Sequence, residues 1–274
     1  MNIDGVCRDL SPLAETIAAK GLTIGAPLEL MAETDSTNDV AKRAAKNGAP
    51  HGATFVAEAQ SRGRGRQGRG WVGTAGESLL FSVLLRVPCE PTRLPPLALV
   101  AGLAVRDAVA RAAPSAEVKI KWPNDVLARK SAAEAYRKVA GVLVEAVLTG
   151  SKVEAIVVGI GLNVHTRSFP EEIASSATSV ALVAGAGTNP PDRATVLADV
   201  LEGLDRDVSH VAARGVGLVH ARLRSADLLL GTAIRTESVS GTAEGIDLDG
   251  RLCVRAADGA LVRVASGEVH LGWG

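Results

Sequence analysis

Glycines and arginines alternate over residues 63–71 in a pattern suited to binding an anionic ligand. The segment reads Gly63-Arg64-Gly65-Arg66-Gln67-Gly68-Arg69-Gly70-Trp71. The glycines let the backbone approach a ligand closely, and the guanidinium groups supply paired donors for phosphate or carboxylate oxygens. The same composition is equally typical of a flexible basic linker or of an arginine–glycine contact to RNA, so the segment alone leaves these interpretations open.

A second cationic segment, KIKWPND at residues 119–125, places Lys121 at the end of a predicted strand. A lysine in that position can project into a site beyond the strand. However, a proline followed by Asn124 and Asp125 is also a common turn sequence. Taken alone, the segment is more typical of a simple turn than of a ligand site.

Two further segments offer small polar groups. ETDSTN, residues 33–38, precedes a predicted helix, where it can bind a small polar ligand or, more simply, cap the helix. GIGLNV, residues 159–164, ends a buried strand. It fails as a dinucleotide fingerprint because Val164 takes the third glycine position and no helix pattern follows. Glycine within a strand instead indicates a close approach of another backbone or a ligand.

Taken in order, these segments resemble the bacterial biotin–protein ligases. The matching motifs are ETDSTN, AEAQSRGRGRQGRGW, KWPNDV, RKVAGVLVE and GIGLNV. The resemblance is close over residues 30–165 and looser toward the C-terminus. It implies that the protein uses ATP to activate biotin as biotinyl-5'-AMP and then transfers biotin to a lysine of a biotin carboxyl carrier protein.

The resemblance also implies a role for individual residues. Those implied to bind biotin are Ser36, Thr37, Asn38, Gln60, Gly63, Arg64, Gly65, Arg66, Lys138 and Gly141. Those implied to bind ATP or the adenylate are Arg66, Arg69, Trp71, Asn124, Lys138 and Asn163. Lys138, Arg66 and Lys121 are the implied catalytic groups, and Asp125 is a candidate for the environment of the acceptor lysine or of a metal. No metal ligand is assigned.

Two features depart from the family pattern. Arg62 stands where many members carry a small residue, which adds positive charge beside the loop. Residues 131–136 lengthen the connection before Lys138, and we expect them to form a surface hairpin.

The implied chemistry explains the choice of residue types. In the first step a biotin carboxylate attacks the α-phosphorus of ATP, and cationic side chains with Mg²⁺ reduce the repulsion between the two anions. The product is a mixed anhydride that water would hydrolyse, so a loop that orders over it would retain it.

The elements that must position these residues are predicted to form an α+β fold. We expect helices over residues 10–20, 36–47, 97–113 and 192–213, and strands over residues 53–60, 78–87, 117–121, 139–148 and 153–164. In the strand at 78–87, Leu79, Phe81, Val83 and Leu85 should share one face. The resemblance implies a mixed-sheet catalytic domain like that of class II synthetases and lipoate ligases.

The pattern changes near residue 228, where five short strands separated by glycine turns indicate a small SH3-like barrel. We therefore predict a catalytic domain over residues 1–225 and a C-terminal β domain over residues 226–274.

The composition argues against several classes of protein. Thirty basic and thirty acidic residues give zero net charge, which argues against a dedicated nucleic-acid binder. Three scattered cysteines favour neither a disulfide framework nor a zinc site, and no signal peptide or membrane-spanning segment is evident. We expect a cytoplasmic protein, monomeric or homodimeric. It should lack the DNA-binding domain of some family members, because only 32 residues precede Glu33.

Three alternatives remain at this point. A lipoate or octanoate ligase would share the fold and a catalytic lysine, but we would not expect it to carry the full arginine–glycine loop. An RNA-binding protein using residues 62–69 would lack an aromatic platform for stacking. A catalytically inactive biotin sensor has no support in the sequence, since the lysines and arginines are present.

Overall fold

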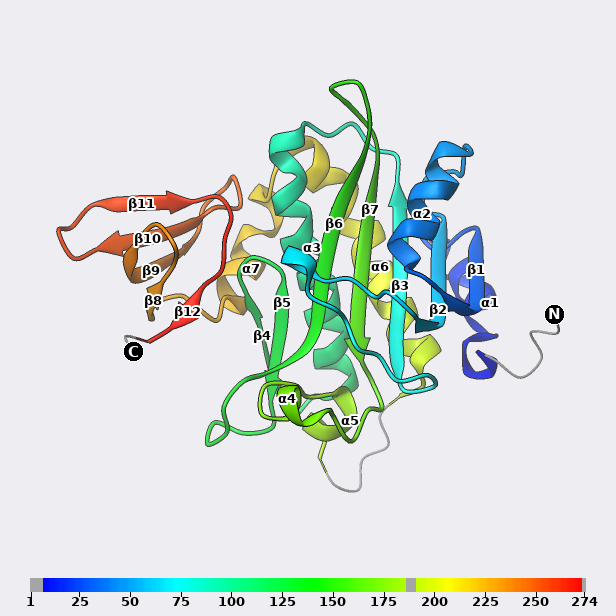
Figure 1. Cartoon of the computed structure of the whole chain (residues 1–274), viewed down its shortest axis with the longest axis horizontal. Helices are drawn as coiled ribbons and strands as arrows, with labels where there is room; N and C mark the ends of the chain where they lie inside the picture. The colour runs from blue at the N-terminus through cyan, green and yellow to red at the C-terminus, as the bar shows by residue number, and fades with distance from the viewer. Residues whose placement is uncertain (1–6, 186–190, 273–274) are drawn as a thin grey trace.

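The computed structural model describes residues 7–185 and 191–272, whose strands form a seven-stranded and a five-stranded sheet (Figure 1). The helices are α1 (Leu13–Ala19), α2 (Thr37–Lys46), α3 (Leu94–Ala112), α4 (Glu171–Ala174), α5 (Val180–Val183), α6 (Arg193–Arg214) and α7 (His220–Ala226). The strands of the larger sheet are β1 (Leu28–Thr34), β2 (Thr54–Gln60), β3 (Ser78–Leu85), β4 (Glu117–Lys121), β5 (Asp125–Arg129), β6 (Arg137–Thr149) and β7 (Lys152–Asn163). Those of the smaller sheet are β8 (Ala233–Arg235), β9 (Ser240–Ile246), β10 (Leu252–Ala256), β11 (Leu261–Val264) and β12 (His270–Leu271).

The larger sheet is mixed, and its order is β1-β2-β3-β7-β6-β5-β4. β1 and β2 run parallel, whereas the other neighbours are antiparallel. Helices α3 and α6 pack together against one face, and α2 covers β2, β3 and β7 on the opposite face (Figure 1). The predicted α+β mixed-sheet fold is therefore confirmed.

Strand β3 shows how the sequence builds the two faces. Leu79, Phe81, Val83 and Leu85 belong to the large apolar core shared with α3 and α6, as predicted. Leu84 points the other way, into the small core formed with α2. Side chains alternate across a strand, so an almost continuous apolar sequence places β3 in the middle of the sheet.

The five short strands predicted near the C-terminus are present as an antiparallel sheet, ordered β11-β10-β9-β8-β12. Trp122 joins the two sheets, because its buried indole Nε1 donates to the carbonyl of Gly250 at 3.0 Å. Helix α7, which ends where we predicted the domain boundary, packs on both β4 and β9. The boundary itself stays a prediction.

The structure adds the short helices α4, α5 and α7 and two strands to the predicted elements, and one predicted helix begins earlier. β1 and β5 were not predicted, and β5 follows the Trp122-Pro123-Asn124 turn directly to form a hairpin with β4. Helix α3 begins at Leu94 rather than at residue 97, because prolines are tolerated in a first turn whose amides have no partner within the helix. Within the described residues, no helix is both long and apolar enough to cross a membrane.

Candidate functional site

A pocket on the α2 side of the larger sheet gathers eleven of the residues predicted to form the site. They are Ser36, Thr37, Asn38, Gln60, Arg64, Gly65, Arg66, Trp71, Asn124, Lys138 and Gly141. These residues come from the start of α2, the end of β2, the arginine–glycine loop, the β4–β5 turn and β6. Segments far apart in the sequence therefore meet at one place because β2, β3, β7 and β6 are neighbours in the sheet. We call this the first pocket.

The floor of the first pocket is shaped by two glycines on the central strand β7. A Cβ at Gly159 would stand 2.0 Å from Oδ1 of Asn38, and a Cβ at Gly161 would stand 2.2 Å from Cε2 of Trp71. Both glycines lie on the same face of β7, two residues apart. The GIGLN segment therefore serves to admit two side chains against the sheet, which agrees with the close approach predicted from glycine within a strand.

One wall of the first pocket consists of neutral hydrogen-bonding groups at the start of α2. Gln60 Oε1 accepts from the amide of Thr37 at 2.7 Å and from its hydroxyl at 3.2 Å. The buried hydroxyl of Ser82 lies 2.8 Å from Oγ1 of Thr37 and 2.6 Å from Oδ1 of Asn38. Such a fixed set of uncharged donors and acceptors suits a polar, uncharged ring rather than an ion.

A second pocket adjoins the first and is lined by cations. The two pockets share Gly65, Arg66, Trp71, Asn124 and Lys138. The second pocket extends from there to Lys121, Arg69 and Asp125. A ligand occupying both pockets would thus pass Lys138 and Arg66 at the junction.

Lys138 is held at this junction by contacts on both its backbone and its side chain. Its amide donates to the carbonyl of Ser176 at 2.7 Å, and its carbonyl accepts from the amide of Thr178 at 2.8 Å. Its Nζ lies 2.7 Å from Asp125 Oδ1 and 5.4 Å from the centre of the Trp71 ring. Residues 131–136 lie in the β5–β6 connection, as predicted, so the insertion leaves the lysine on β6.

The electrostatics of the second pocket favour an anion. Burial lowers the pKa of Lys121, with Lys138 and Arg69 adding to the effect and Asp125 opposing it. Burial likewise lowers the pKa of Arg66, whose Nη1 donates to Asn124 Oδ1 at 3.2 Å. Cations that have lost water and face one another are stabilised by a bound anion.

The smaller sheet also contributes to the second pocket. Gly267, Glu268, Val269 and His270 form part of its wall, and the Glu268 carboxylate contacts the guanidinium of Arg69. The sequence left the role of the C-terminal β domain open. The structure brings its last segment to the cationic site.

Two predicted residues lie outside both pocket walls. Asn163 is buried, and its Nδ2 donates to the carbonyl of Thr178 at 3.0 Å. Gly63 lies at the base of the loop, where its carbonyl accepts from the amide of Trp71 at 3.1 Å. The Asn163 side chain therefore does not border the cationic site.

Sequence reasoning missed other polar residues around the site. Ser82 interrupts the apolar run of β3, SLLFSVLL, in its interior, and that interruption was an available signal. Glu145 ends the motif RKVAGVLVE, and the family resemblance implied no role for it. Its Oε2 accepts from Asn38 Nδ2 at 2.7 Å. Among the described residues no group of three or more His, Cys, Asp or Glu side chains could hold a metal ion.

Comparison with protein families gives two matches along the chain. Residues 30–163 match the model described as the biotin/lipoate A/B protein ligase family. Residues 232–272 match the biotin protein ligase C-terminal domain.

Individual relatives agree with these matches. The chain is 38% identical to a biotin–[acetyl-CoA-carboxylase] ligase of Mycobacterium tuberculosis, over 89% of each chain. It is 33% identical to a ligase of the same name from Paracoccus denitrificans, over 89% of this chain and 100% of that one. Among solved structures, a biotin protein ligase from Aquifex aeolicus in complex with biotin and ATP superposes with a TM-score of 0.74. That structure shares 30% identity, and the match covers 90% of this chain and 99% of that chain.

Proposed function

The chain belongs to the biotin/lipoate A/B protein ligase family and is an ATP-dependent biotin protein ligase, and from that premise we propose how its residues divide the reaction. The enzyme activates biotin with ATP and transfers it to a carrier protein. The observation that supports our assignment of residues is the junction of the two pockets, where Lys138 and Arg66 border both.

The first pocket is the proposed biotin site. Its neutral wall, built from Thr37, Asn38 and Gln60, matches the uncharged ureido group of biotin in hydrogen-bonding character. Leu143, on the same face of β6 as Gly141, offers this pocket an apolar side chain that suits the aliphatic chain of biotin. This orientation directs the carboxylate of biotin toward Lys138.

The second pocket is the proposed nucleotide site. Lys121, Arg66 and Arg69 supply positive charge for the phosphates, and Trp71 offers its ring to the adenine. Mg²⁺ that enters with ATP would find two carboxylates here, Asp125 paired with Lys138 and Glu268 paired with Arg69, and this fits a metal held largely by phosphates and water. When bound, Mg²⁺ would supply additional positive charge against the phosphates.

The first half-reaction places two anions in contact at the junction. A carboxylate oxygen of biotin attacks the α-phosphorus, a new C–O–P linkage forms, and the bond to pyrophosphate breaks. Lys138 and Arg66 lower the repulsion between the reacting groups, and both are fixed before ligands arrive, so little reorganisation is required. The arginine–glycine loop then excludes water from the mixed anhydride.

The second half-reaction requires a neutral amine from the carrier. The lysine nitrogen attacks the acyl carbon, AMP leaves, and the amine loses a proton. The unperturbed pKa of lysine is about 10.4, and the cations at the junction would favour the neutral amine by repulsion. Asp125 is a carboxylate of the second pocket that can orient the amine. We propose a biotin carboxyl carrier domain as the acceptor.

The test is biotin-dependent exchange of labelled pyrophosphate into ATP, with lipoate and no added acid as controls. We expect exchange with biotin and Mg²⁺ only. Exchange with lipoate in place of biotin would reassign the substrate, and absence of exchange with either acid would contradict the proposed division of residues. A second assay should follow transfer of biotin to a purified carrier domain and to the same domain lacking its acceptor lysine.

A further inference from the structure

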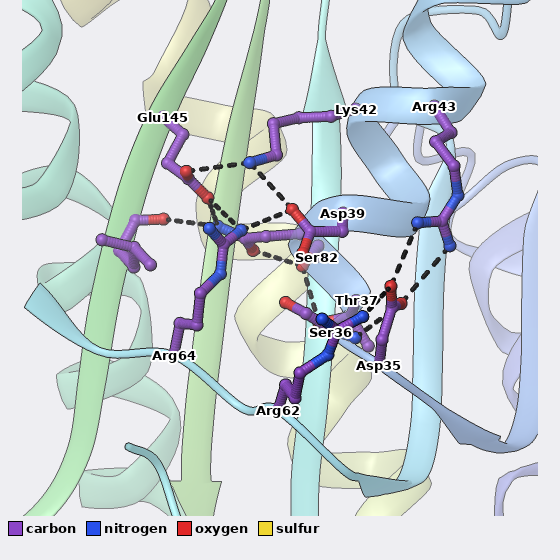
Figure 2. Close-up of polar contacts among 12 residues, drawn as sticks. Asp35, Ser36, Thr37, Asp39, Lys42, Arg43, Arg62, Arg64, Ser82 and Glu145 are labelled. Atoms are coloured by element: carbon purple, nitrogen blue, oxygen red, sulfur yellow. Dashed lines mark hydrogen bonds and ion pairs between the residues drawn. The ribbon is translucent and has the colours of Figure 1, made fainter. Parts of the chain in front are cut away.

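Four charged residues beside the first pocket form a closed ring of ion pairs (Figure 2). Arg64 Nη2 lies 2.6 Å from Asp39 Oδ1, which lies 2.9 Å from Lys42 Nζ. Lys42 Nζ lies 3.0 Å from Glu145 Oε1, and Glu145 Oε2 lies 3.2 Å from Arg64 Nη2. Charges alternate around the ring, so it is neutral overall. We call these four residues the charge ring.

The charge ring joins three separate elements. Asp39 and Lys42 lie on α2, Glu145 lies on β6, and Arg64 lies on the arginine–glycine loop. Arg64 is thus the ring member that belongs to the loop, and its two partners belong to the body of the protein. The ring therefore fixes the loop against the α2 side of the sheet.

The ring is also connected to the wall of the first pocket. Glu145 Oε2 accepts from Asn38 Nδ2 at 2.7 Å as well as from Arg64. Asn38 in turn packs against Gly159 on the pocket floor. One carboxylate oxygen therefore positions both the loop and a pocket side chain, although Glu145 itself does not line the pocket.

We propose that Arg64 is a positioning residue whose guanidinium holds the loop closed through Asp39 and Glu145, and that it does not bind the anionic groups of the substrates. This inference rests on the proposed biotin site and revises the role that the family resemblance implies for the Arg64 side chain. Of the two arginines Arg64 and Arg66, Arg66 is the one that binds the substrate anions. Glu145 is the second positioning residue, because it links the loop to Asn38.

The partners of the two arginines support this division. Arg64 faces two carboxylates, so an incoming phosphate or carboxylate would meet like charge from Asp39 and Glu145. Arg66 donates to a neutral partner, Asn124, and lies at the junction of both pockets. Its charge therefore remains available to an anion.

The test compares Arg64→Gln, Glu145→Gln and the double variant with Arg43→Gln as the matched control. Arg43 also lies on α2 and pairs with a carboxylate, Asp35 at 3.2 Å, but is not a member of the ring (Figure 2). Amide hydrogen exchange over residues 61–71 in the ligand-free protein reports on the loop. The dissociation rate of biotin and the KM for ATP report on the site.

We expect both single variants to accelerate loop exchange and biotin dissociation by about three- to tenfold, which corresponds to the loss of one or two partly exposed ion pairs. The effect of the double variant should be smaller than the sum of the two single effects, because both changes break the Arg64–Glu145 contact. Arg43→Gln should match the wild type, and the KM for ATP should stay within about twofold in all four proteins. Arg64→Lys should restore part of the protection from amide hydrogen exchange that residues 61–71 lose in Arg64→Gln.

Three results would overturn the proposal. One is unchanged loop exchange in Arg64→Gln and Glu145→Gln. Another is a fully additive double variant. The third is a tenfold or greater rise in the KM for ATP in Arg64→Gln, which would assign its guanidinium to the nucleotide. Loop exchange in the ligand-free protein needs no biotin chemistry, so it tests the ring even if the proposed function failed.

Wild-type protein offers an independent measurement. Raising ionic strength from about 0.05 to 0.5 M screens partly exposed ion pairs. Exchange over residues 61–71 should therefore accelerate with salt in the wild type and much less in Glu145→Gln. Equal salt dependence in both proteins would contradict the ring as the contact that closes the loop.

Discussion

The side-chain oxygen of Asn38 lies so close to Gly159 that a Cβ at residue 159 would stand 2.0 Å from it. This contact sets the depth of the first pocket, because Asn38 can reach the sheet only where β7 has no side chain. Gly161 has the same relationship to Trp71, since a Cβ at residue 161 would stand 2.2 Å from Cε2 of the indole. The two glycines therefore seat Asn38, which lines the first pocket, and Trp71, which borders both pockets, side by side on one strand.

Alanine at each glycine should consequently impair a different substrate. Gly159→Ala displaces Asn38 and should raise the Kd for biotin by at least about tenfold, since its hydrogen bonds contribute about 1 kcal/mol each. Gly161→Ala displaces Trp71 and should chiefly raise the KM for ATP. Titration calorimetry with biotin and steady-state kinetics in ATP would measure the two effects.

Gly102→Ala is the control for that pair. A Cβ at residue 102 would meet its nearest neighbours, Ile120 and Val126, at 3.9 Å, and the residue lies within α3. Alanine there should be tolerated or stabilise the helix by up to about 1 kcal/mol. If Gly159→Ala and Gly161→Ala behaved like this control, the close contacts would not determine the site.

Lys138→Gln should abolish most adenylation while leaving the fold intact. Removing one preorganised charge-stabilising group typically costs about 10²- to 10³-fold in rate. The Lys138–Asp125 pair is partly exposed, so its loss should change the free energy of unfolding by no more than about 1 kcal/mol. Pyrophosphate exchange would measure the loss of adenylation, and urea unfolding would measure the change in the free energy of unfolding. A variant with normal exchange would remove Lys138 from the proposed mechanism.

Lys121→Met should stabilise the ligand-free protein near neutral pH and weaken ATP binding. Burial lowers the pKa of Lys121, so its charge opposes folding at pH values below that lowered pKa. As pH rises through the folded-state pKa, the folded protein loses the proton before the unfolded chain does, and stability increases. The stability of the wild type should therefore approach that of the variant as the pH nears 10.5, the pKa of lysine in the unfolded chain. Urea unfolding of both proteins from about pH 7 to 10 would reveal whether this difference narrows.

The buried guanidinium of Arg193 should be important for stability rather than catalysis. It bonds to Glu58 at 2.6 and 2.8 Å and to Asp9 at 2.6 and 2.7 Å, which ties α6 to β2 and to the N-terminal segment. Burial alone would raise the pKa of Glu58, but hydrogen bonds from Arg193 and the Gly76 amide lower it. Arg193→Met would leave that carboxylate without its cation and should cost about 3–5 kcal/mol.

Asp9→Asn provides the comparison for Arg193→Met. The Asp9 side chain is partly exposed, so water can replace much of its interaction, and the loss should stay near about 1 kcal/mol. Thermal and urea unfolding would measure both variants. Equal losses would mean that the buried Arg193–Glu58 contact contributes no more than the exposed one.

Much of the fold could be predicted because the signals are local. The alternation of Leu79, Phe81, Val83 and Leu85 indicated one face of a central strand, and those residues share the α3–α6 core. β5 escaped prediction because VLAR after a proline turn is too short for a periodic pattern. Its strand conformation depends on pairing with β4 on one side and β6 on the other, and no pattern within its own five residues indicates these partners.

The site's chemical groups could be named from the amino-acid sequence alone, since the motifs at residues 36–38, 60–71, 121–125 and 138–141 carry its hydrogen-bonding and cationic groups in contiguous runs. How those groups are partnered depends on the three-dimensional fold. β3 and β6 both flank β7, and that order brings Ser82 to Asn38, Glu145 to Arg64, and Trp71 onto Gly161. The fold also brings Glu268 from the smaller sheet to Arg69 and pairs Asn163 with a backbone carbonyl. These pairings follow from strand order and domain packing, which are set by burial of the whole apolar core, so no local pattern identifies the partner of each residue.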